Sequence, residues 1–209
     1  MASESSDKPT RGHKKKARTR RRLLDAGVVA FGRLGTAMTV QHVVAEAEVS
    51  HGTFYNYFDD LDALVDAVAV EVLTELSDAV ASAGHPDPAQ RFATASLRML
   101  TMLGRRVDLA SVVLRLAVSG DGEPGFTAHL RADLAEGRTS GRFRTLAPGV
   151  DEDVVFGMFV VSFHRIVTGR WIEDRARLVV EHLLEVLGVP AAEAAALVAE
   201  AAVSLSPPT

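Results

Sequence analysis

The chain contains no cysteine among its 209 residues. Disulfide bonds, thiolate zinc sites and cysteine nucleophiles are therefore excluded, which fits an intracellular protein. No uninterrupted apolar run approaches the roughly 18 residues of a membrane-spanning helix, and the basic N-terminus is not followed by an apolar stretch like that of a signal peptide. We therefore expect a soluble, cytoplasmic protein without a membrane partner.

Basic residues are scarce outside the first segment of the chain. Lysine is absent after Lys16, and neither lysine nor arginine occurs between Arg33 and Arg91. Residues 1–22 carry nine Lys or Arg against two acidic residues, a net charge of +7, while the remainder carries fourteen against twenty-five, a net charge of −11. The overall net charge of −4 would argue against nucleic acid as a partner only if it were evenly spread. This distribution instead indicates a basic arm on an acidic body.

The basic arm, KKKARTRRR from Lys14 to Arg22, follows a segment at residues 1–13 whose serine, proline, glycine and charged residues predict disorder. A solvated tail is the simplest interpretation of such a run. Its position directly before the helical motif described below favours contact with DNA phosphates instead. The predicted phosphate contacts in this arm are Lys14, Lys15, Lys16, Arg18, Arg20, Arg21 and Arg22.

Strand-like alternation of apolar and polar residues is absent over any useful length, whereas apolar residues recur at helical spacing along the chain. Hydrophobic residues make up 47% of the chain, enough for a substantial core. The sequence predicts an all-α protein, with an N-terminal three-helix domain over residues 14–70 and a C-terminal helical domain over 71–209. Predicted helices of the second domain cover residues 89–105, 108–118, 126–139, 151–168, 174–187 and 191–204.

The stretch from Thr39 to Phe58, TVQHVVAEAEVSHGTFYNYF, predicts two short helices joined by a tight turn. Thr39 suits the N-cap of the first helix, and Ser50 suits that of the second. Phe54 and Phe58 are four residues apart and therefore share the face that meets the core. The opposite face carries glycine, small polar groups and tyrosine, which can approach another surface without desolvating a charge. In a helix-turn-helix this face enters the DNA major groove.

Residues 49–58, VSHGTFYNYF, followed by LVDAV at 64–68, closely resemble the N-terminal DNA-binding domain of TetR-family transcriptional regulators. The resemblance covers about residues 18–70, and the rest of the chain matches only in its all-helical plan. It implies phosphate contacts from the Thr39 and tyrosine positions and base contacts from the start of the second helix. By its chemistry, the Asn56 amide can bond bidentately to adenine, and the Thr53 methyl can meet a thymine methyl. The candidate DNA-binding residues of the motif are Thr39, Ser50, His51, Gly52, Thr53, Tyr55, Asn56 and Tyr57.

The chain departs from the family pattern at two positions. Glu48 stands in the turn where the family usually has glycine, and a left-handed backbone there costs a non-glycine residue about 1 kcal/mol. Leu61 stands where the family usually has a lysine that touches a phosphate. Three carboxylates, Asp59, Asp60 and Asp62, follow the second helix. Helix capping explains them, but they oppose DNA unless cations elsewhere outweigh them.

The predicted helix at 151–168 is apolar around nearly its whole circumference, and the helix at 174–187 carries a strong apolar stripe. A helix that is apolar all round is buried on all sides, which in a chain of this size indicates a second subunit. A thick monomeric core is the alternative. The resemblance implies dimerisation through the last two major helices, and two-fold DNA half-sites require two recognition helices. The candidate interface residues are Phe156, Val160, Val167, Leu183, Val186 and Leu187.

Methionine, leucine and phenylalanine side chains in the second domain suit an adaptable apolar pocket, with arginine, histidine and serine beside them. An ordinary core is the alternative for each apolar residue. The resemblance implies an effector site in this domain, and these side chains favour a small hydrophobic molecule with an anionic or polar end. The candidate effector-binding residues are Arg98, Met99, Met102, Leu103, Leu114, Arg115, Phe126, His129, Phe159, Ser162 and Phe163.

The sequence contains no catalytic constellation. A single E-x-x-H spacing, Glu48 to His51, crosses the predicted turn and lacks the second copy that di-iron bundles use. We therefore predict no enzyme, no metal site and no cofactor. The sequence predicts a ligand-responsive transcriptional repressor, a homodimer that binds a palindromic double-stranded DNA operator and is released by its effector. The alternative is a helix-turn-helix relic with weak DNA affinity that mainly binds a small molecule or a protein.

Overall fold

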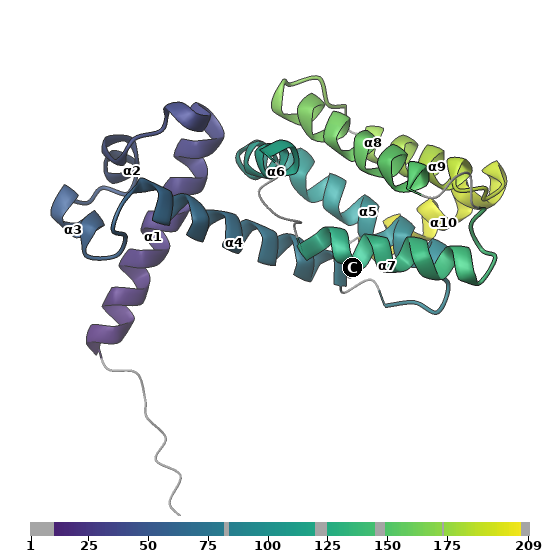
Figure 1. Ribbon diagram of the computed structural model, residues 1–209, viewed down its shortest axis with the longest axis horizontal. Coiled ribbons are helices and arrows are strands. Elements are labelled where there is room, and N and C mark those ends of the chain that lie inside the picture. Colours follow the sequence, from purple (N-terminus) through teal and green to yellow (C-terminus); the bar gives the residue numbers. More distant parts are fainter. Residues whose placement is uncertain (1–10, 82–83, 120–124, 145–148, 173, 206–209) are drawn as a thin grey trace, which may run out of the picture. The chain divides into compact units, whose positions relative to one another are not determined.

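The computed structural model describes residues 11–81, 84–119, 125–144, 149–172 and 174–205, and the regular elements in these ranges are all helices (Figure 1). The predicted all-α fold is confirmed. The chain divides into two compact units, Met1–Val68 and Ala69–Thr209. This division falls two residues before the predicted domain boundary. In the described ranges no helix has both the length and the apolar character needed to cross a membrane.

The first unit consists of α1 (Arg11–Leu34), the 3-10 helix η1 (Gly35–Ala37), α2 (Val40–Glu46), α3 (His51–Tyr55) and the beginning of α4 (Leu61–Ala81). Its core includes Leu23 of α1, Phe54 of α3 and Leu64 of α4, all completely buried. Gly27 permits the close approach of α1 to α4, because a Cβ at this position would lie 2.9 Å from the Val68 side chain. The core thus holds the two short helices against the longer ones.

Helix α1 starts earlier than the sequence predicted. Its first residue is Arg11, so the last three residues of the segment predicted to be disordered are helical, and residues 1–10 lie outside the described ranges. Lysine, arginine and alanine are good helix formers, so the basic run continues the helix rather than interrupting it. At the other end Gly35 follows α1 with φ +55°, a left-handed conformation that glycine adopts without a steric penalty.

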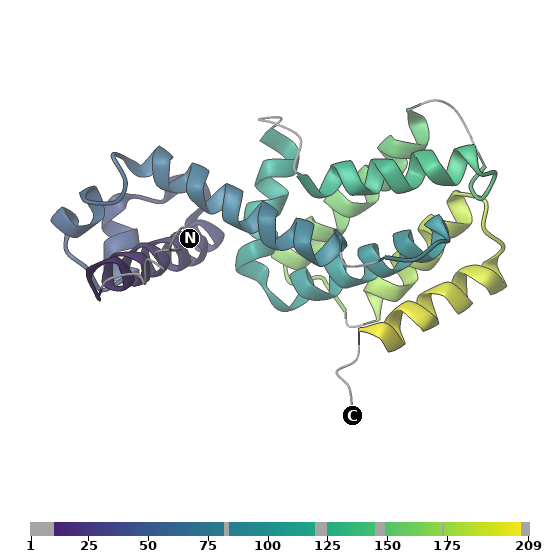
Figure 2. The ribbon, with the colours of Figure 1, turned by 90° about the horizontal axis from the view of Figure 1, so that it is seen from below.

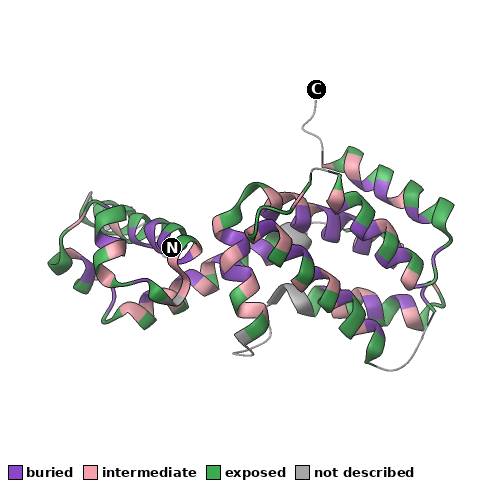
Figure 3. Cartoon of the chain, turned by 90° about the horizontal axis from the view of Figure 1, so that it is seen from above, coloured by how far each residue is buried: buried purple, intermediate pink, exposed green. Residues whose placement is uncertain are grey.

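The second unit contains the remainder of α4 and six further helices, whose bounds agree within one residue with the predicted ones. They are α5 (Pro88–Arg105), α6 (Val107–Ser119), α7 (Gly125–Thr139), α8 (Val150–Val167), α9 (Arg175–Val186) and α10 (Ala191–Ser204). Helix α5 lies at the centre of this unit. It packs against each of α6 to α10 and is buried along most of its length (Figures 2 and 3).

An ion-pair cluster joins the start of α5 to two other parts of the second unit. The Asp87 carboxylate accepts the Ala89 N–H at 2.9 Å, capping α5, and also accepts two hydrogen bonds from the Arg142 guanidinium at 2.9 and 3.0 Å. Arg142 in turn donates to Glu193 of α10 at 2.6 Å. Burial raises the pKa of Asp87, but the hydrogen bonds from Arg142 and Ala89 outweigh it and hold this pKa below its ordinary value. The carboxylate therefore stays ionised and links three segments.

Helix α8 is not enclosed by its own subunit. Phe159 and Phe163 are buried and stacked with ring centroids 6.3 Å apart. On another face, Val150, Val154 and Val161 are 48%, 37% and 48% exposed. Gly157 lies between these valines in sequence, and a Cβ there would meet no atom within 4 Å. The predicted burial on all sides is therefore not reached within one subunit.

Candidate nucleic-acid interface

Helix α2 begins with a capping box. The Thr39 hydroxyl accepts the His42 N–H at 3.4 Å, and the His42 Nδ1 accepts the Thr39 N–H at 3.2 Å. Val43 and Val44 of this helix are buried, so one face of α2 is fixed in the core. This arrangement sets the direction in which α2 enters the turn and leaves Thr39 exposed at its start.

The turn between α2 and α3 is strained and is held from outside the motif. Glu48 has φ +50° and is the non-glycine residue with a left-handed backbone in the described ranges, as the sequence predicted for this position. The Arg22 guanidinium of α1 donates to the Ala47 carbonyl oxygen at 2.6 Å and to the Glu48 carboxylate at 3.5 Å. Arg22 therefore anchors the turn, a role that the sequence does not predict for this residue of the basic arm.

Helix α3 starts at His51, and its N-cap is Ser50, as predicted. The Ser50 hydroxyl accepts the Thr53 N–H at 3.1 Å and lies 2.9 Å from the Thr53 hydroxyl. Phe54 is completely buried and packs against Phe58, with ring centroids 5.8 Å apart. Because Phe54 fixes the rotation of α3, the side of the helix opposite to it faces outward.

The predicted DNA-binding residues of α3 and its C-terminal end lie mainly on that outward side. His51, Gly52, Tyr55 and Asn56 are exposed, and Tyr55 has 55% of its surface accessible. Thr53 and Tyr57 are half-buried, and the Thr53 hydroxyl already bonds to the N-cap. Asn56 is the residue that ends α3 rather than a residue inside it. No hydrogen bond joins its side chain to another described residue, so its amide is available to a partner.

Sequence reasoning missed one residue of this surface. Gln41 of α2 is exposed, and its Oε1 atom lies 2.6 Å from Nε2 of His51. The contact orients the imidazole at the start of α3 and brings a second amide to the same surface. The two residues are ten apart in sequence and meet only because the turn folds α3 back beside α2. No pattern in either helix alone indicates this pair.

The basic arm forms the first turns of α1 and is exposed throughout the residues predicted to contact phosphates. These residues differ in what holds them. Arg20 lies over the Phe58 ring, 5.5 Å from its centroid, and Arg21 pairs with Asp25 at 2.9 Å. In contrast, Lys14, Lys15, Lys16 and Arg18 make no side-chain ion pair within the described ranges. These four side chains are the free cations of the arm.

One of the three acidic residues after α3, Asp60, has the predicted capping role. The Asp60 carboxylate accepts the Ala63 N–H at 2.8 Å and caps α4. Asp59 and Asp62 are exposed, and Asp62 lies in the first turn of α4, where a carboxylate complements the helix dipole. Leu61, at the position where a phosphate-binding lysine was expected by resemblance, is half-buried. This end of the motif therefore adds no cation to the surface.

Exchange of Glu48 for glycine is expected to stabilise the first unit by about 1 kcal/mol, because glycine adopts the left-handed conformation without strain. It also removes a carboxylate from the turn and should tighten DNA binding. Thermal unfolding and fluorescence anisotropy measure the two effects separately. Glu48→Gln is the matched control, since it removes the charge but keeps the strain, and should improve binding only. A lower stability of Glu48→Gly would mean that the Arg22–Glu48 contact outweighs the strain.

The residues predicted to bind an effector do not form one surface. Met99, Leu103, Phe159 and Phe163 are at most 2% exposed and belong to the core, and Ser162 donates to the Met158 carbonyl oxygen at 2.8 Å. Arg98 and Met102 are half-buried, while Arg115 and His129 are exposed. The side chain of Phe126 lies outside the described part of the structure. Effector binding at these residues stays a prediction.

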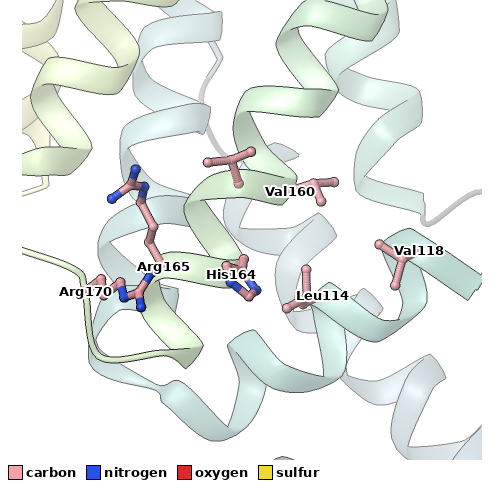
Figure 4. Close-up of a pocket in the computed structure, with 7 residues that line it drawn as sticks. Leu114, Val118, Val160, His164, Arg165 and Arg170 are labelled. Atoms are coloured by element: carbon pink, nitrogen blue, oxygen red, sulfur yellow. The ribbon is translucent and has the colours of Figure 1, made fainter.

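A hollow of about 450 Å³ lies between α6 and α8 (Figure 4). Of the predicted effector residues it contains Leu114, and of the predicted interface residues Val160. Five further residues complete the lining. They are Val118, Val161, His164, Arg165 and Arg170.

Two of the predicted interface residues need correction. Leu183 and Leu187 are 1% and 2% exposed within one subunit, because α9 packs against α5 and α10. Their side chains belong to the subunit's own core and cannot form a surface for a partner. The remaining four predicted interface residues are half-buried: Phe156, Val160, Val167 and Val186.

The first unit combines a helix-turn-helix, an outward polar face on α3 and a basic helix, and this combination defines a DNA-binding domain. Residues 23–68 match the family model of bacterial regulatory proteins of the tetR family. Over this domain the chain is similar to the TetR family, as the sequence indicated.

A curated relative supports this assignment over the same region. The chain is similar to the HTH-type transcriptional regulator BetI 2 of Chromohalobacter salexigens, with 39% identity over 67 residues. The alignment covers 32% of this chain and 32% of that regulator, so the comparison does not extend to the second unit.

Solved structures extend the fold comparison to nearly the whole chain. A gamma-butyrolactone receptor described as ArpA-like aligns with a TM-score of 0.71 and 21% identity, covering 92% of this chain and all of the receptor. The transcriptional regulator FadR from Bacillus subtilis in complex with stearoyl-CoA aligns with a TM-score of 0.66 and 18% identity, covering 81% of this chain and 98% of FadR. At these identities the comparison shows a common fold.

Proposed function

We propose that the protein is a ligand-responsive transcriptional repressor that binds a palindromic operator as a homodimer. The exposed face of α3 supports this proposal most directly. It presents uncharged polar groups at a helix-turn-helix whose rotation is fixed by a completely buried phenylalanine, Phe54. Acting on DNA, the protein would work in the cytoplasm.

In this proposal the two parts of the first unit have different tasks. The exposed cations of α1 bind the phosphate backbone without regard to sequence and account for most of the salt-dependent affinity. The amide of Asn56, together with Gln41 and His51, meets base edges in the major groove. Gly52 allows the backbone at the start of α3 to approach the DNA closely.

The experiment that tests this function compares two duplexes. One contains the region upstream of the protein's own gene, and the other is a shuffled duplex of equal length and composition. Anisotropy titrations over a range of salt concentrations should show tighter binding to the upstream duplex, with a steep salt dependence for both. Equal and weak binding to the two duplexes at low ionic strength would contradict the proposal and favour the relic.

A dimer through α8 is supported by the exposed apolar stripe on that helix. Val150, Val154, Gly157 and Val161 recur at spacings of four and three residues, which places them on one helix face. Leu178 of α9 is a further exposed apolar residue of this unit, with 53% of its surface accessible. Such a stripe can be covered by the same stripe of a second subunit, as an isologous interface requires.

Val154→Asp is expected to shift the protein from dimer to monomer, because a dimer interface would bury two carboxylates without partners. Light scattering coupled to size-exclusion chromatography measures the change in mass. Val203→Asp is a matched control, since Val203 of α10 is 76% exposed and lies outside the stripe. A dimeric Val154→Asp variant would place the interface elsewhere.

The effector part of the proposal is supported by the ligands named for two proteins of the same fold. FadR was solved with stearoyl-CoA, and the receptor is named for a gamma-butyrolactone. We propose by the same logic that the second unit of this chain binds a small hydrophobic molecule. Binding would favour a conformation of the dimer that fits the operator poorly.

A further inference from the structure

We propose that the hollow between α6 and α8 binds an amphipathic carboxylate, with its alkyl chain on the valines and leucine and its carboxylate at the arginines. The assignment of such a molecule as an effector rests on the proposed function, whereas its binding does not. The volume of about 450 Å³ falls within the range of small-molecule sites.

The floor of the hollow is apolar and exposed. Leu114 and Val118 come from α6, and Val160 and Val161 come from α8 (Figure 4). Val118 is 65% exposed and Val161 48%, so this surface remains in contact with water in a single subunit. An alkyl chain laid over these side chains would remove apolar surface from water, at about 25 cal/mol per Å².

The polar side of the hollow consists of one histidine and two arginines. His164 and Arg165 lie in the last turn of α8, and Arg170 follows shortly after that helix. No carboxylate of the described ranges forms an ion pair with Arg165 or Arg170. The segments that line the hollow contain no acidic residue, since residues 109–118, 154–167 and 169–172 include neither Asp nor Glu.

This cationic side is unusual for its surroundings. Residues 69–209 carry thirteen Lys or Arg against eighteen Asp or Glu, so the unit as a whole is acidic. Arginine side chains that pair with no carboxylate of the described ranges, beside an apolar floor, are complementary to an anion attached to an alkyl chain. A neutral or cationic amphiphile would match the floor but not the arginines.

A second copy of the chain is the competing occupant, because Val161 also belongs to the α8 stripe. A partner's stripe would cover Val161, whereas the rest of the apolar floor and both arginines lie outside the stripe. The hollow therefore extends beyond the proposed interface, and its two arginines favour a carboxylate ligand.

Isothermal titration calorimetry with three probes tests the proposal on the full-length protein. Decanoate, 1-decanol and decyltrimethylammonium carry the same alkyl chain on an anionic, a neutral and a cationic head. Decanoate should bind at least about fivefold more tightly than decanol, a difference expected from one or two partly exposed charge-assisted hydrogen bonds. The cationic probe should bind most weakly. Decanol binding as tightly as decanoate would overturn the proposal.

Variants assign the binding to this hollow. Arg165→Ala combined with Arg170→Ala should remove the preference for decanoate but leave decanol binding unchanged. Val118→Asp should weaken decanoate more than decanol, and this side chain is exposed enough to be replaced without unfolding the helix. Arg177→Ala is the control, because Arg177 is an exposed arginine of α9 outside the hollow. Unchanged decanoate binding in both the double arginine variant and Val118→Asp would overturn the assignment. A Val118→Asp variant that loses the dimer but binds decanoate as the wild type does would also overturn it.

DNA titrations in the presence of decanoate separate this inference from the proposed function. Weaker operator binding by the wild type, but not by the Arg165→Ala, Arg170→Ala double variant, would support both. Decanoate binding without any DNA binding would contradict the regulator while leaving the ligand site intact. The reverse, operator binding with no decanoate bound, would contradict the ligand site alone.

Discussion

Replacing Lys14, Lys15, Lys16 and Arg18 with glutamine is expected to weaken DNA binding by roughly three to four orders of magnitude for each arm at 0.1 M salt. Each phosphate contact contributes a slope of about −0.9 to the dependence of log affinity on log salt concentration. At 0.1 M salt, the loss of one contact therefore lowers the affinity by about 0.9 log units. The four cations are exposed and make no ion pair within the described ranges, so the whole of their charge is available to phosphates. Anisotropy titrations at several salt concentrations measure both the affinity and the slope.

The slope distinguishes lost phosphate contacts from a general change in charge. The variant should lose roughly three to four units of slope for each arm that binds. Arg105→Gln combined with Arg177→Gln is a suitable control, because both arginines are exposed and lie in the second unit. If this control lowers the slope as much as the arm variant does, the arm has no special role.

Arg22 provides an internal contrast. Its guanidinium donates to the Ala47 carbonyl oxygen, so Arg22→Gln should disturb the turn and lower the affinity for the operator. Because the charge is already engaged, the salt slope should change by less than about one unit. A full unit of slope lost in this variant would show that Arg22 leaves the turn and contacts a phosphate when DNA binds.

Asp87→Ala is expected to destabilise the second unit by about 2 to 3 kcal/mol. About 1 kcal/mol comes from loss of the α5 N-cap, and the rest from loss of the two hydrogen bonds that Arg142 donates. The expected loss is modest because the side chains of Arg142 and Asp87 remain partly exposed, at 23% and 29%. Denaturation in urea, followed by circular dichroism, measures the change.

The pH dependence of this effect has a definite sign. The pKa of Asp87 is lower in the folded protein than its ordinary value of 3.8, so its stabilisation is present at neutral pH and is lost as the pH falls through the folded pKa. The difference between wild type and Asp87→Asn should therefore be constant above about pH 5 and shrink below about pH 4. Asparagine still caps the helix, so this variant isolates the ion pair.

The carboxylate of Asp133 changes the stability with pH in the opposite direction to Asp87. For this reason the wild type must be compared with Asp87→Asn. Burial raises the pKa of Asp133, and this effect exceeds the opposing hydrogen bond from Arg91. The destabilisation that its charge causes is relieved as the pH falls through the raised pKa. Acid titration of the wild type alone would therefore mix the two effects, whereas the difference from Asp87→Asn reports on Asp87.

The helices and the motif could be predicted from the sequence because their signals are local. Apolar residues at helical spacing, the caps at Thr39 and Ser50 and the break near Pro86 each lie within a few residues of the boundary that they set. The exposed face of α3 follows from the burial of Phe54 in the same way. These features require no knowledge of distant parts of the chain.

Features that depend on contacts between distant residues could not be predicted. Arg22 meets Ala47 across 25 residues, and Arg142 meets Asp87 across 55. In the second unit, composition does not show which apolar residues face inward, so the sequence predicts Leu183 and Leu187 at the interface although both are core residues. Helix α9 is amphipathic, and only its packing against α5 and α10 decides what its apolar stripe covers.

The bond between Arg22 and Ala47 has a consequence for how the first unit opens. It joins the middle of α1 to the peptide that precedes the recognition helix. Local unfolding of the turn must therefore break a contact with α1. The turn and the middle of α1 are thus expected to unfold as one cooperative unit, instead of α3 and its turn unfolding independently of α1. Amide hydrogens in the turn should then exchange with solvent at rates close to those of the neighbouring part of α1.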